Sequence, residues 1–554
     1  MIVKNFFKLS KNFAYLLSLL LVIYLRFRWS TVSQWREDSA TNIWLAYTKN
    51  FNELPVGLLS SKMVPNPNGI ILIGKIFTTI ESVLHLTFVL SLFQVFLFFL
   101  LSREISSNKS LNNFTFLVLS FSTIISASSI EFWNNWILIL PNTLFFIFLF
   151  KYLNTTNSKF LLISCCLLIV PSSIYLAGIS NSIIYFLLIF IVLFKSKNYK
   201  KIKFKIKHLL ATVFFYLINF LIVWNPYFKS LKLSEIFGFS GLTTYDRVNI
   251  FSDTFLELPG FFITFWTKKQ SFYINHIDIT GITNVHTRTL HELFKIYVEF
   301  HKVIIVMFIA VIIFSIRNLI KINDVKIDNK LFDKLFLFFV FIIFSALLNP
   351  IIGGPNYVNY ERVENMNQYY QYFLIIWLCT PFLVVEKFYQ KKLILFNNIV
   401  FFIFLLVNIL LSFSIFSDSL NYDGDKLIES DVPLIHKIEV VDYIGSSILE
   451  KNSELNTTIS YDLGGGTWNW IPSHGEYFST WYKDYPFTIG RIFDYQLLRK
   501  YSIKNDYEGL VSRDFIDSDY IISYKFEYHE ALDNKNYEHE YFGRLRVSKL
   551  ISGN

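Results

Sequence analysis

The sequence predicts an α-helical polytopic membrane protein with about eleven transmembrane helices, followed by a small soluble α/β domain at the C-terminal end. Of its 554 residues, 53% are hydrophobic and 61 are phenylalanine, and the mean hydropathy is +0.42, which is far more apolar than an ordinary soluble protein. Apolar stretches of about 17–25 residues recur through the first 415 positions, and each can cross a hydrocarbon layer as a helix. After position 416 charged residues become frequent and the apolar runs shorten to strand length.

Eleven stretches have the length and apolar content of membrane spans. The first follows Lys4, Lys8 and Lys11, and no small-residue cleavage site precedes Arg26, so it is interpreted as an uncleaved span rather than a secretory signal. The alternating pattern of a membrane β-barrel is absent from the sequence. The predicted spans are 12–29, 82–101, 111–130, 136–152, 160–176, 181–195, 208–224, 302–320, 332–349, 369–386 and 393–413.

The distribution of basic residues selects one orientation. With a cytoplasmic N-terminus, the inside loops hold most of the Lys and Arg, including the seven lysines of 195–207, whereas the outside loops near 131–135 and 176–181 hold none. The formal charge of +9 is therefore a topology signal, and nucleic acid is not an expected partner; the lipid bilayer is. The odd number of spans places the C-terminus outside.

Three predicted outside segments are too long to be simple connections: 30–81, 225–301 and the tail from about 416. The domain prediction is therefore a membrane domain over 1–415, with outside loops 30–81 and 225–301, and an extracytoplasmic α/β domain over 416–554. In the tail, 457–462 and 519–525 are predicted strands, whereas 434–451 and 493–503 are predicted helices.

The first outside loop begins with two adjacent carboxylates, Glu37 and Asp38, ahead of a predicted helix in which Ala40, Ile43 and Trp44 fall at helical spacing. Two interpretations apply, and they are compatible. Asp38 can cap a helix that begins at Ser39, because aspartate accepts backbone N–H bonds there and favours the positive end of the helix dipole. Alternatively, a carboxylate at the membrane boundary can act as a general base toward an attacking hydroxyl.

The residues that follow the acid pair resemble the opening of the glycosyltransferase C superfamily, and in particular its polyprenyl-phosphate-sugar-dependent members, the protein O-mannosyltransferases and the lipid A aminoarabinose transferases. The resemblance in topology covers the whole chain, but at the level of motifs it is confined to about 35 residues. The positions that match the outline of the loop are Leu54, Pro55, Val56, Gly57, Ser60, Ser61, Pro65, Pro67 and Gly69.

This resemblance implies a fold of the same superfamily and an inverting transfer at the outer face of the cytoplasmic membrane. An acceptor hydroxyl would attack the anomeric carbon of a sugar, and a polyprenyl phosphate would leave. Asp38 is the favoured base, although the mannosyltransferases usually present Asp-Glu whereas this chain presents Glu-Asp, so Glu37 stays a candidate. The oligosaccharyltransferase signature Trp-Trp-Asp-Tyr-Gly is absent from the tail.

The leaving phosphate requires cations, and the outside segments offer few. Arg362 is the first candidate, with a snorkelling interfacial arginine paired to Glu361 or Glu364 as the alternative. Arg288, His286 and His291 follow, with a solvated loop face as the alternative. Candidates for the substrate pocket are Glu131, Tyr369 and Tyr370; Glu131 can equally be a surface acid, and the tyrosines can equally be interfacial anchors.

No cofactor is predicted. Glu37 and Asp38 could hold a divalent metal with waters, but adjacent carboxylates on a helix diverge and no further cluster of ligands completes a site. The three cysteines lie in apolar runs and indicate neither a disulfide framework nor a zinc site.

Two other functions remain open: an O-antigen-type polymerase or ligase, which would depend on arginine and histidine of the later loop, and a lipid-linked sugar flippase or transporter. The transporter would place ionisable residues within spans and use broken helices, and few charged residues fall within the predicted spans.

Overall fold

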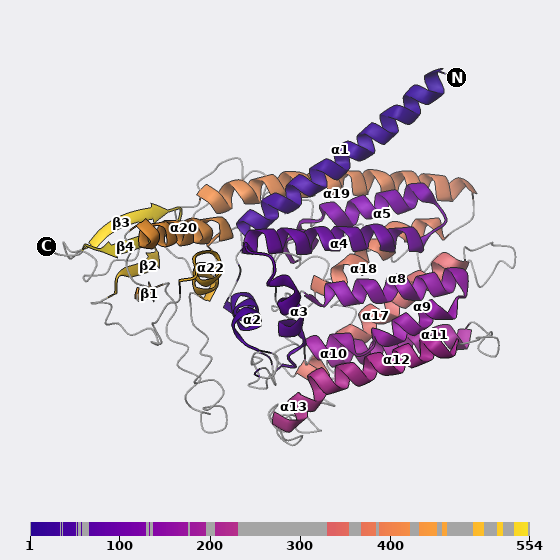
Figure 1. Cartoon of the computed structure of the whole chain (residues 1–554). Coiled ribbons are helices and arrows are strands. Elements are labelled where there is room, and N and C mark those ends of the chain that lie inside the picture. The colour runs from indigo at the N-terminus through magenta and orange to yellow at the C-terminus, as the bar shows by residue number, and fades with distance from the viewer. Residues whose placement is uncertain are drawn as a thin grey trace.

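The computed structural model is mostly helical, and a four-stranded sheet lies beyond one end of a helix bundle (Figure 1). We call this end of the bundle the sheet end. The structure describes residues 2–33, 35, 37–50, 53, 57, 66–128, 132, 137–175, 178–195, 205–230, 329–353, 367–383, 387–421, 432–450, 457–462, 491–503, 518–524 and 537–551.

Four of the described helical stretches are long and apolar enough to cross a membrane: Tyr15–Val32, Val83–Ile105, Ile206–Lys229 and Lys391–Leu410. Three shorter apolar stretches accompany them, at Ser158–Ile174, Gly178–Phe194 and Gln371–Phe382. The prediction of a mostly helical chain with helices long and apolar enough to cross a membrane is therefore confirmed, whereas the number of eleven spans stays a prediction. The predicted span 302–320 lies outside the described residues.

The bundle is built from helices whose apolar runs set their lengths. Most of the predicted spans overlap a single helix, and the ends differ by up to ten residues. These helices are α1 (Ile2–Val32), α4 (Val83–Ile105), α8 (Ile139–Thr155), α11 (Gly178–Lys195), α17 (Asn329–Gly353), α18 (Asn367–Cys379, with a short 3₁₀ extension Thr380–Phe382) and α19 (Lys387–Asn421).

Two predicted spans are divided into shorter helices, and a third is continuous but changes its helical winding. The span 111–130 divides at Ser122 into α5 (Lys109–Phe121) and α6 (Thr123–Ser128). The span 160–176 divides into α9 (Ser158–Cys166) and α10 (Val170–Ile174), where Pro171 stands in the first turn of the second piece. The span 208–224 is α12 (Ile206–Asn219), which widens into a π-helical turn (Phe220–Trp224) and continues directly into α13 (Asn225–Ser230).

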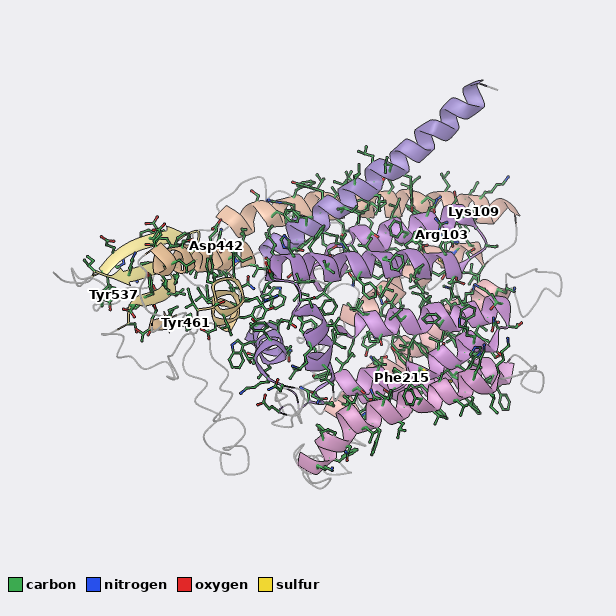
Figure 2. All side chains as sticks on the ribbon, in the orientation of Figure 1. Arg103, Lys109, Phe215, Asp442, Tyr461 and Tyr537 are labelled. Atoms are coloured by element: carbon green, nitrogen blue, oxygen red, sulfur yellow. The ribbon has the colours of Figure 1, made fainter. Side chains whose placement is uncertain are left out.

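Polar contacts hold together the end of the bundle opposite the sheet. Buried Lys334 of α17 donates to the carbonyl oxygens of Glu104 (2.6 Å) and Ile105 (2.9 Å), the last residues of α4. Asn154 of α8 donates to the Glu104 carboxylate at 2.8 Å. Terminal carbonyls have no partner within their own helix, so a lysine there satisfies two of them. Figure 2 shows Arg103 and Lys109 at this same end, far from Asp442, Tyr461 and Tyr537.

We expect Lys334→Met to lower the stability of the chain by about 2–3 kcal/mol, because two buried carbonyls lose their donor. Thermal unfolding of the purified protein in detergent measures this as a lower midpoint. Lys330→Met, one turn away on an exposed position of the same helix, is the matched control and should leave the midpoint unchanged. Equal midpoints for the two variants would contradict the capping role.

The C-terminal residues form two helices and a mixed sheet. Helices α20 (Leu434–Glu450) and α22 (Arg491–Tyr501) accompany strands β1 (Ile459–Asp462), β2 (Tyr520–Tyr524), β3 (Tyr537–Phe542) and β4 (Leu545–Leu550). The strand order is β1-β2-β4-β3, with β1 parallel to β2 and the other pairs antiparallel. The two helices and the first two strands lie where the sequence predicts them; the β3–β4 hairpin was missed.

Two short helices, α2 (Glu37–Thr48) and α3 (Gly69–Phe77), lie between the bundle and the C-terminal elements (Figure 1). One continuous cluster of buried side chains includes Ile43 of α2, Ile71 of α3, Ile444 of α20, Tyr495 of α22 and Val547 of β4. A second cluster fills the bundle itself. Helices α2 and α3 therefore share one hydrophobic core with the C-terminal elements and pack directly against them.

Candidate functional site

The acid pair occupies the first turn of α2, because this helix begins at Glu37 and not at Ser39. Asp38 therefore lies inside the helix and not at the capping position that the sequence suggested. The helix start follows a turn in which Trp35 has a positive φ of 42°, which bulky residues rarely adopt. The side chains of Glu37 and Asp38 lie outside the described parts of the structure.

Trp35 fixes the entry to this helix. Its side chain is fully buried, and its indole nitrogen donates to Thr87 Oγ1 of α4 at 2.8 Å. Two residues earlier, the carbonyl of Ser33 accepts a hydrogen bond from the backbone N–H of Leu434, the first residue of α20 (2.7 Å). A left-handed conformation in a large residue costs on the order of 1–3 kcal/mol, and surrounding contacts must maintain it. Here α4 and α20 supply those contacts, immediately before the acid pair.

Helix α3 holds the other end of α2. Lys75 donates to the carbonyl of Ala46 at 3.1 Å and also to the carbonyl of Lys49, so a cation stands at the negative end of the α2 dipole. The two helices approach closely at Gly74, where an added Cβ would lie 2.9 Å from the Cβ of Ala46 and 3.1 Å from the ring of Phe132. The packing leaves α2 little room to slide along α3.

At two positions of the motif that carries the family resemblance, Gly57 and Gly69, the structure leaves no room for a side chain. The backbone N–H of Gly57 donates to the carbonyl of Asn66 (2.6 Å), which closes the loop on itself, and a Cβ at Gly57 would lie 2.6 Å from the carbonyl oxygen of Pro67. At Gly69, a Cβ would lie 2.2 Å from the carbonyl oxygen of Ser173 in α10. The other matching positions of the motif are outside the described residues, except Pro67.

Helix α22, which belongs to the C-terminal elements, packs against α2. Tyr47 of α2 meets Tyr495 edge to face, with ring centroids 5.7 Å apart. The guanidinium carbon of Arg499 lies 5.4 Å from the centre of the Tyr47 ring. Burial raises the pKa of Tyr495 to about 12, so this phenol stays neutral at physiological pH.

Of the other predicted site residues, the structure places only Tyr369 with its side chain. Arg362, Arg288, His286, His291 and Glu131 lie outside the described residues; Tyr370 belongs to α18, but its side chain is not described. The predictions for these six residues stand untested.

Tyr369 is fully buried and belongs to a polar network inside the bundle. Its hydroxyl donates to Asn181 Oδ1 of α11 at 2.9 Å, and Asn181 in turn donates to Asn142 Oδ1 of α8 at 3.3 Å. Tyr185 donates to the same oxygen of Asn142. The ring of Tyr369 also packs edge to face on Phe341. These contacts link α18 to α11, α8 and α17; the prediction of Tyr369 as a pocket residue stays untested.

Sequence reasoning assigned no role to Arg26, which lies within the predicted first span 12–29. Arg26 has no exposed surface, and its guanidinium donates to Gln94 Oε1 of α4 (3.0 Å) and to the carbonyl of Ser120 (3.2 Å). Ser120 lies in the last turn of α5, directly before the break at Ser122. An ionisable residue inside a membrane segment is costly and is a functional candidate by default.

The other side of the same break is capped from α19. Asn408 Oδ1 accepts hydrogen bonds from the backbone N–H and the hydroxyl of Thr123, both at 2.9 Å, at the start of α6. Hydrogen bonds from Arg26 on one side and to Asn408 on the other therefore satisfy backbone groups at the break between α5 and α6. The nearest sequence signals were the arginine within an apolar run and the polar residues Ser120, Ser122 and Thr123.

Among the C-terminal elements, buried His436 of α20 packs under the β3–β4 turn. An added Cβ at Gly543, whose φ is +56°, would lie 2.1 Å from the His436 ring. Burial, reinforced by the positive charge of Arg544, lowers the pKa of His436 from 6.5 to about 4. The unfolded chain therefore binds this proton more tightly than the folded chain between these two pH values.

We expect the stability of α20 and the β3–β4 hairpin to be constant above pH 6.5 and to fall by about 2–3 kcal/mol as the pH drops from 6.5 to 4. Hydrogen exchange of the amides of α20 in the full chain, corrected for the intrinsic pH dependence of exchange, measures this loss. His436→Phe keeps a ring in the same space and should remove most of the pH dependence. A variant that loses protection as steeply as the wild type would contradict the assignment to His436.

Within the described residues, no group of three or more His, Cys, Asp or Glu side chains could hold a metal ion. Comparison with known proteins adds no family: no family model, no curated protein and no solved structure matches this chain.

Proposed function

We propose that this protein is a membrane glycosyltransferase that moves one sugar from a polyprenyl-phosphate carrier to an acceptor hydroxyl. The sheet end of the bundle would lie at the extracytoplasmic face of the cell membrane, with eleven spans and an extracytoplasmic α/β domain over 416–554. Asp38 would act as general base, with Glu37 as the alternative. Arg362, Arg288, His286 and His291 would neutralise the leaving phosphate, and Glu131, Tyr369 and Tyr370 would line the substrate pocket.

The observation that carries this proposal is the way α2 is held. Its first turn carries the acid pair, and four other elements fix it: Trp35 against α4, Ser33 against α20, Lys75 of α3 at its far end, and α22 along its side. A general base must be positioned before its pKa matters. The positive end of the helix dipole favours the ionised form of acids in the first turn, which is the form that accepts a proton.

The charge distribution supports the proposed orientation. Arg103 and Lys109 lie at the end of the bundle opposite the sheet (Figure 2), and Lys334 lies with them through its bonds to the end of α4. Basic residues concentrate on the cytoplasmic side of membrane proteins. The acid pair, at the sheet end, would then face outward.

A panel of polyprenyl-phosphate-linked monosaccharides, offered to the purified protein with membrane extract as the source of acceptor, tests this function. We expect at least one donor to yield free polyprenyl phosphate together with a glycosylated product, and nucleotide sugars not to be consumed. Consumption of a nucleotide sugar, with every lipid-linked donor left intact, would refute the proposed donor class.

A second candidate, transport of a lipid-linked sugar, is favoured by Arg26. A buried cation beside a helix that breaks within an apolar segment is the arrangement by which transporters build sites for polar substrates. The sequence alone argued against transport because few charged residues fell within spans; the position of Arg26 weakens that argument. The two functions differ in one outcome, since transport leaves the sugar–phosphate bond intact.

A further inference from the structure

We propose that helix α22 of the C-terminal part positions the candidate catalytic helix α2. Tyr495 and Arg499 contact Tyr47 and thereby hold α2 in the orientation in which its first-turn acids act. Both are positioning residues and not catalytic ones. This inference rests on the proposed function for its catalytic consequence, but its structural consequence can be measured without any activity.

The contact is concentrated on one side chain of α2. Tyr495 and Arg499 are four residues apart and therefore lie on the same face of α22. Both meet Tyr47: Tyr495 by an edge-to-face ring contact with planes at 90°, and Arg499 by its cation over the ring. A cation near the ring and a second aromatic ring perpendicular to it together fix the position of the Tyr47 ring.

Helix α2 can transmit this placement to the acid pair. Tyr47 stands near the last residue of α2 and Glu37 is its first, so the two are about 15 Å apart along a helix of three turns. Lys75 holds the same end of α2 from the α3 side. A helix this short is stiff, and a tilt at Tyr47 changes the direction of its first turn.

Helix α22 is itself firmly held by the C-terminal elements. Tyr461 of β1 donates to Asp494 at 2.5 Å and stacks on Phe493. The hydroxyl of Tyr501 donates to Asp442 of α20 at 3.0 Å. At Gly445 of α20, a Cβ would lie 2.4 Å from the ring of Tyr501, so this ring packs directly on the α20 backbone. The sheet, α20 and α22 thus form a rigid support for α2.

The chemistry of the two side chains points to placement and not to proton transfer. Within the described residues, the Tyr495 hydroxyl and the Nε of Arg499 have no hydrogen-bond partner, although both atoms are buried. What each group supplies to Tyr47 is a ring edge and a charge. Removing the hydroxyl alone should therefore cost nothing, whereas removing the ring or the charge should free α2.

Two pairs of variants separate these contributions. Tyr495→Phe keeps the ring and Tyr495→Leu removes it; Arg499→Lys keeps the charge and Arg499→Met removes it. Lys500→Met is the matched control on the same helix, because it deletes a half-exposed ion pair with Asp442 that contributes little to stability. The full chain is used throughout.

Hydrogen exchange of the α2 amides is the first measurement. We expect Tyr495→Leu and Arg499→Met to speed exchange in residues 37–48 about tenfold, while α4 and α8 keep their protection. Tyr495→Phe, Arg499→Lys and Lys500→Met should behave as the wild type. Unchanged α2 exchange in both disruptive variants, or equal loss in the conservative and disruptive members of a pair, would overturn the inference.

Kinetics is the second measurement. If α22 only positions α2, the disruptive variants should lower kcat about tenfold while KM stays within about twofold. If Tyr495→Phe instead lowers kcat and raises KM, the hydroxyl contacts substrate. That result would overturn the positioning role. A wild-type chain that transfers no sugar refutes the proposed function, and the exchange measurement then decides on the role of α22 alone.

Discussion

Asp38→Asn should lower sugar transfer by roughly 10²–10⁴-fold and leave the affinity for the donor nearly unchanged, because asparagine fills the same space but cannot accept the proton of the attacking hydroxyl. Initial rates of transfer by the purified variant, at several donor concentrations, measure both quantities. Asparagine is tolerated near helix starts, so the fold of α2 should be retained.

Glu37→Gln is the matched variant for this experiment, since it makes the same change one residue earlier in the same turn. We expect a much smaller loss, of about tenfold or less, from the weaker negative potential beside the base. Reversal of the two effects would assign the base to Glu37. Full activity in both variants would rule out a general base in this turn.

Arg26→Met should lower the stability of the chain by about 2–4 kcal/mol, because the carbonyl of Ser120 and the side-chain oxygen of Gln94 lose a buried donor while methionine keeps most of the packing volume. Chemical denaturation in detergent measures the loss. Arg28→Met is the matched control two residues later; Arg28 is only partly buried and lies 5.8 Å from the Phe416 ring, so its loss should cost less than 1 kcal/mol by the usual scale of such contacts.

The double variant Arg26→Met with Gln94→Leu tests the reason for that loss. The double variant removes the Gln94 side-chain oxygen that Arg26→Met leaves without its donor, so it should recover about 1 kcal/mol of stability relative to Arg26→Met. A double variant less stable than either single variant would instead show that Gln94 stabilises the bundle through other partners.

The sequence predicted those parts of the fold that depend on local pattern. Unbroken apolar runs of sufficient length identified α4, α8 and α19, and the shift to short alternating runs located β1 and β2. The β3–β4 hairpin carried a weaker signal, because its first strand holds two glutamates and a histidine, and only the glycine at its turn marked it.

Features set by distant residues could not be predicted in this way. The break at Ser122 lies inside a predicted span where Ser120, Ser122 and Thr123 are the local signal, and the Asn408 side chain that caps the second piece is 285 residues away. The left-handed turn at Trp35 depends on Thr87 of α4, which nothing in the local sequence indicates. The contact of Tyr47 with Tyr495 joins positions more than four hundred residues apart.

The candidate site shows the same division. An acidic pair ahead of a helical pattern was enough to predict a helix start that carries carboxylates, with the boundary displaced by two residues. The supports of that helix came from α3, α4, α20 and α22, and the residues around the acid pair do not indicate them. Arg26 was visible as a charge in an apolar run, but its burial depends on the positions of α4 and α5.

The fate of a doubly labelled donor in proteoliposomes tests the central claim most directly. One label marks the sugar and the other marks the polyprenyl phosphate, and acceptor is supplied on the side of the membrane that holds the C-terminal part. We predict that the wild-type protein separates the two labels, and that the transferred sugar has the anomeric configuration opposite to that in the donor. Movement of both labels together across the bilayer, with the bond between them intact, would contradict the account.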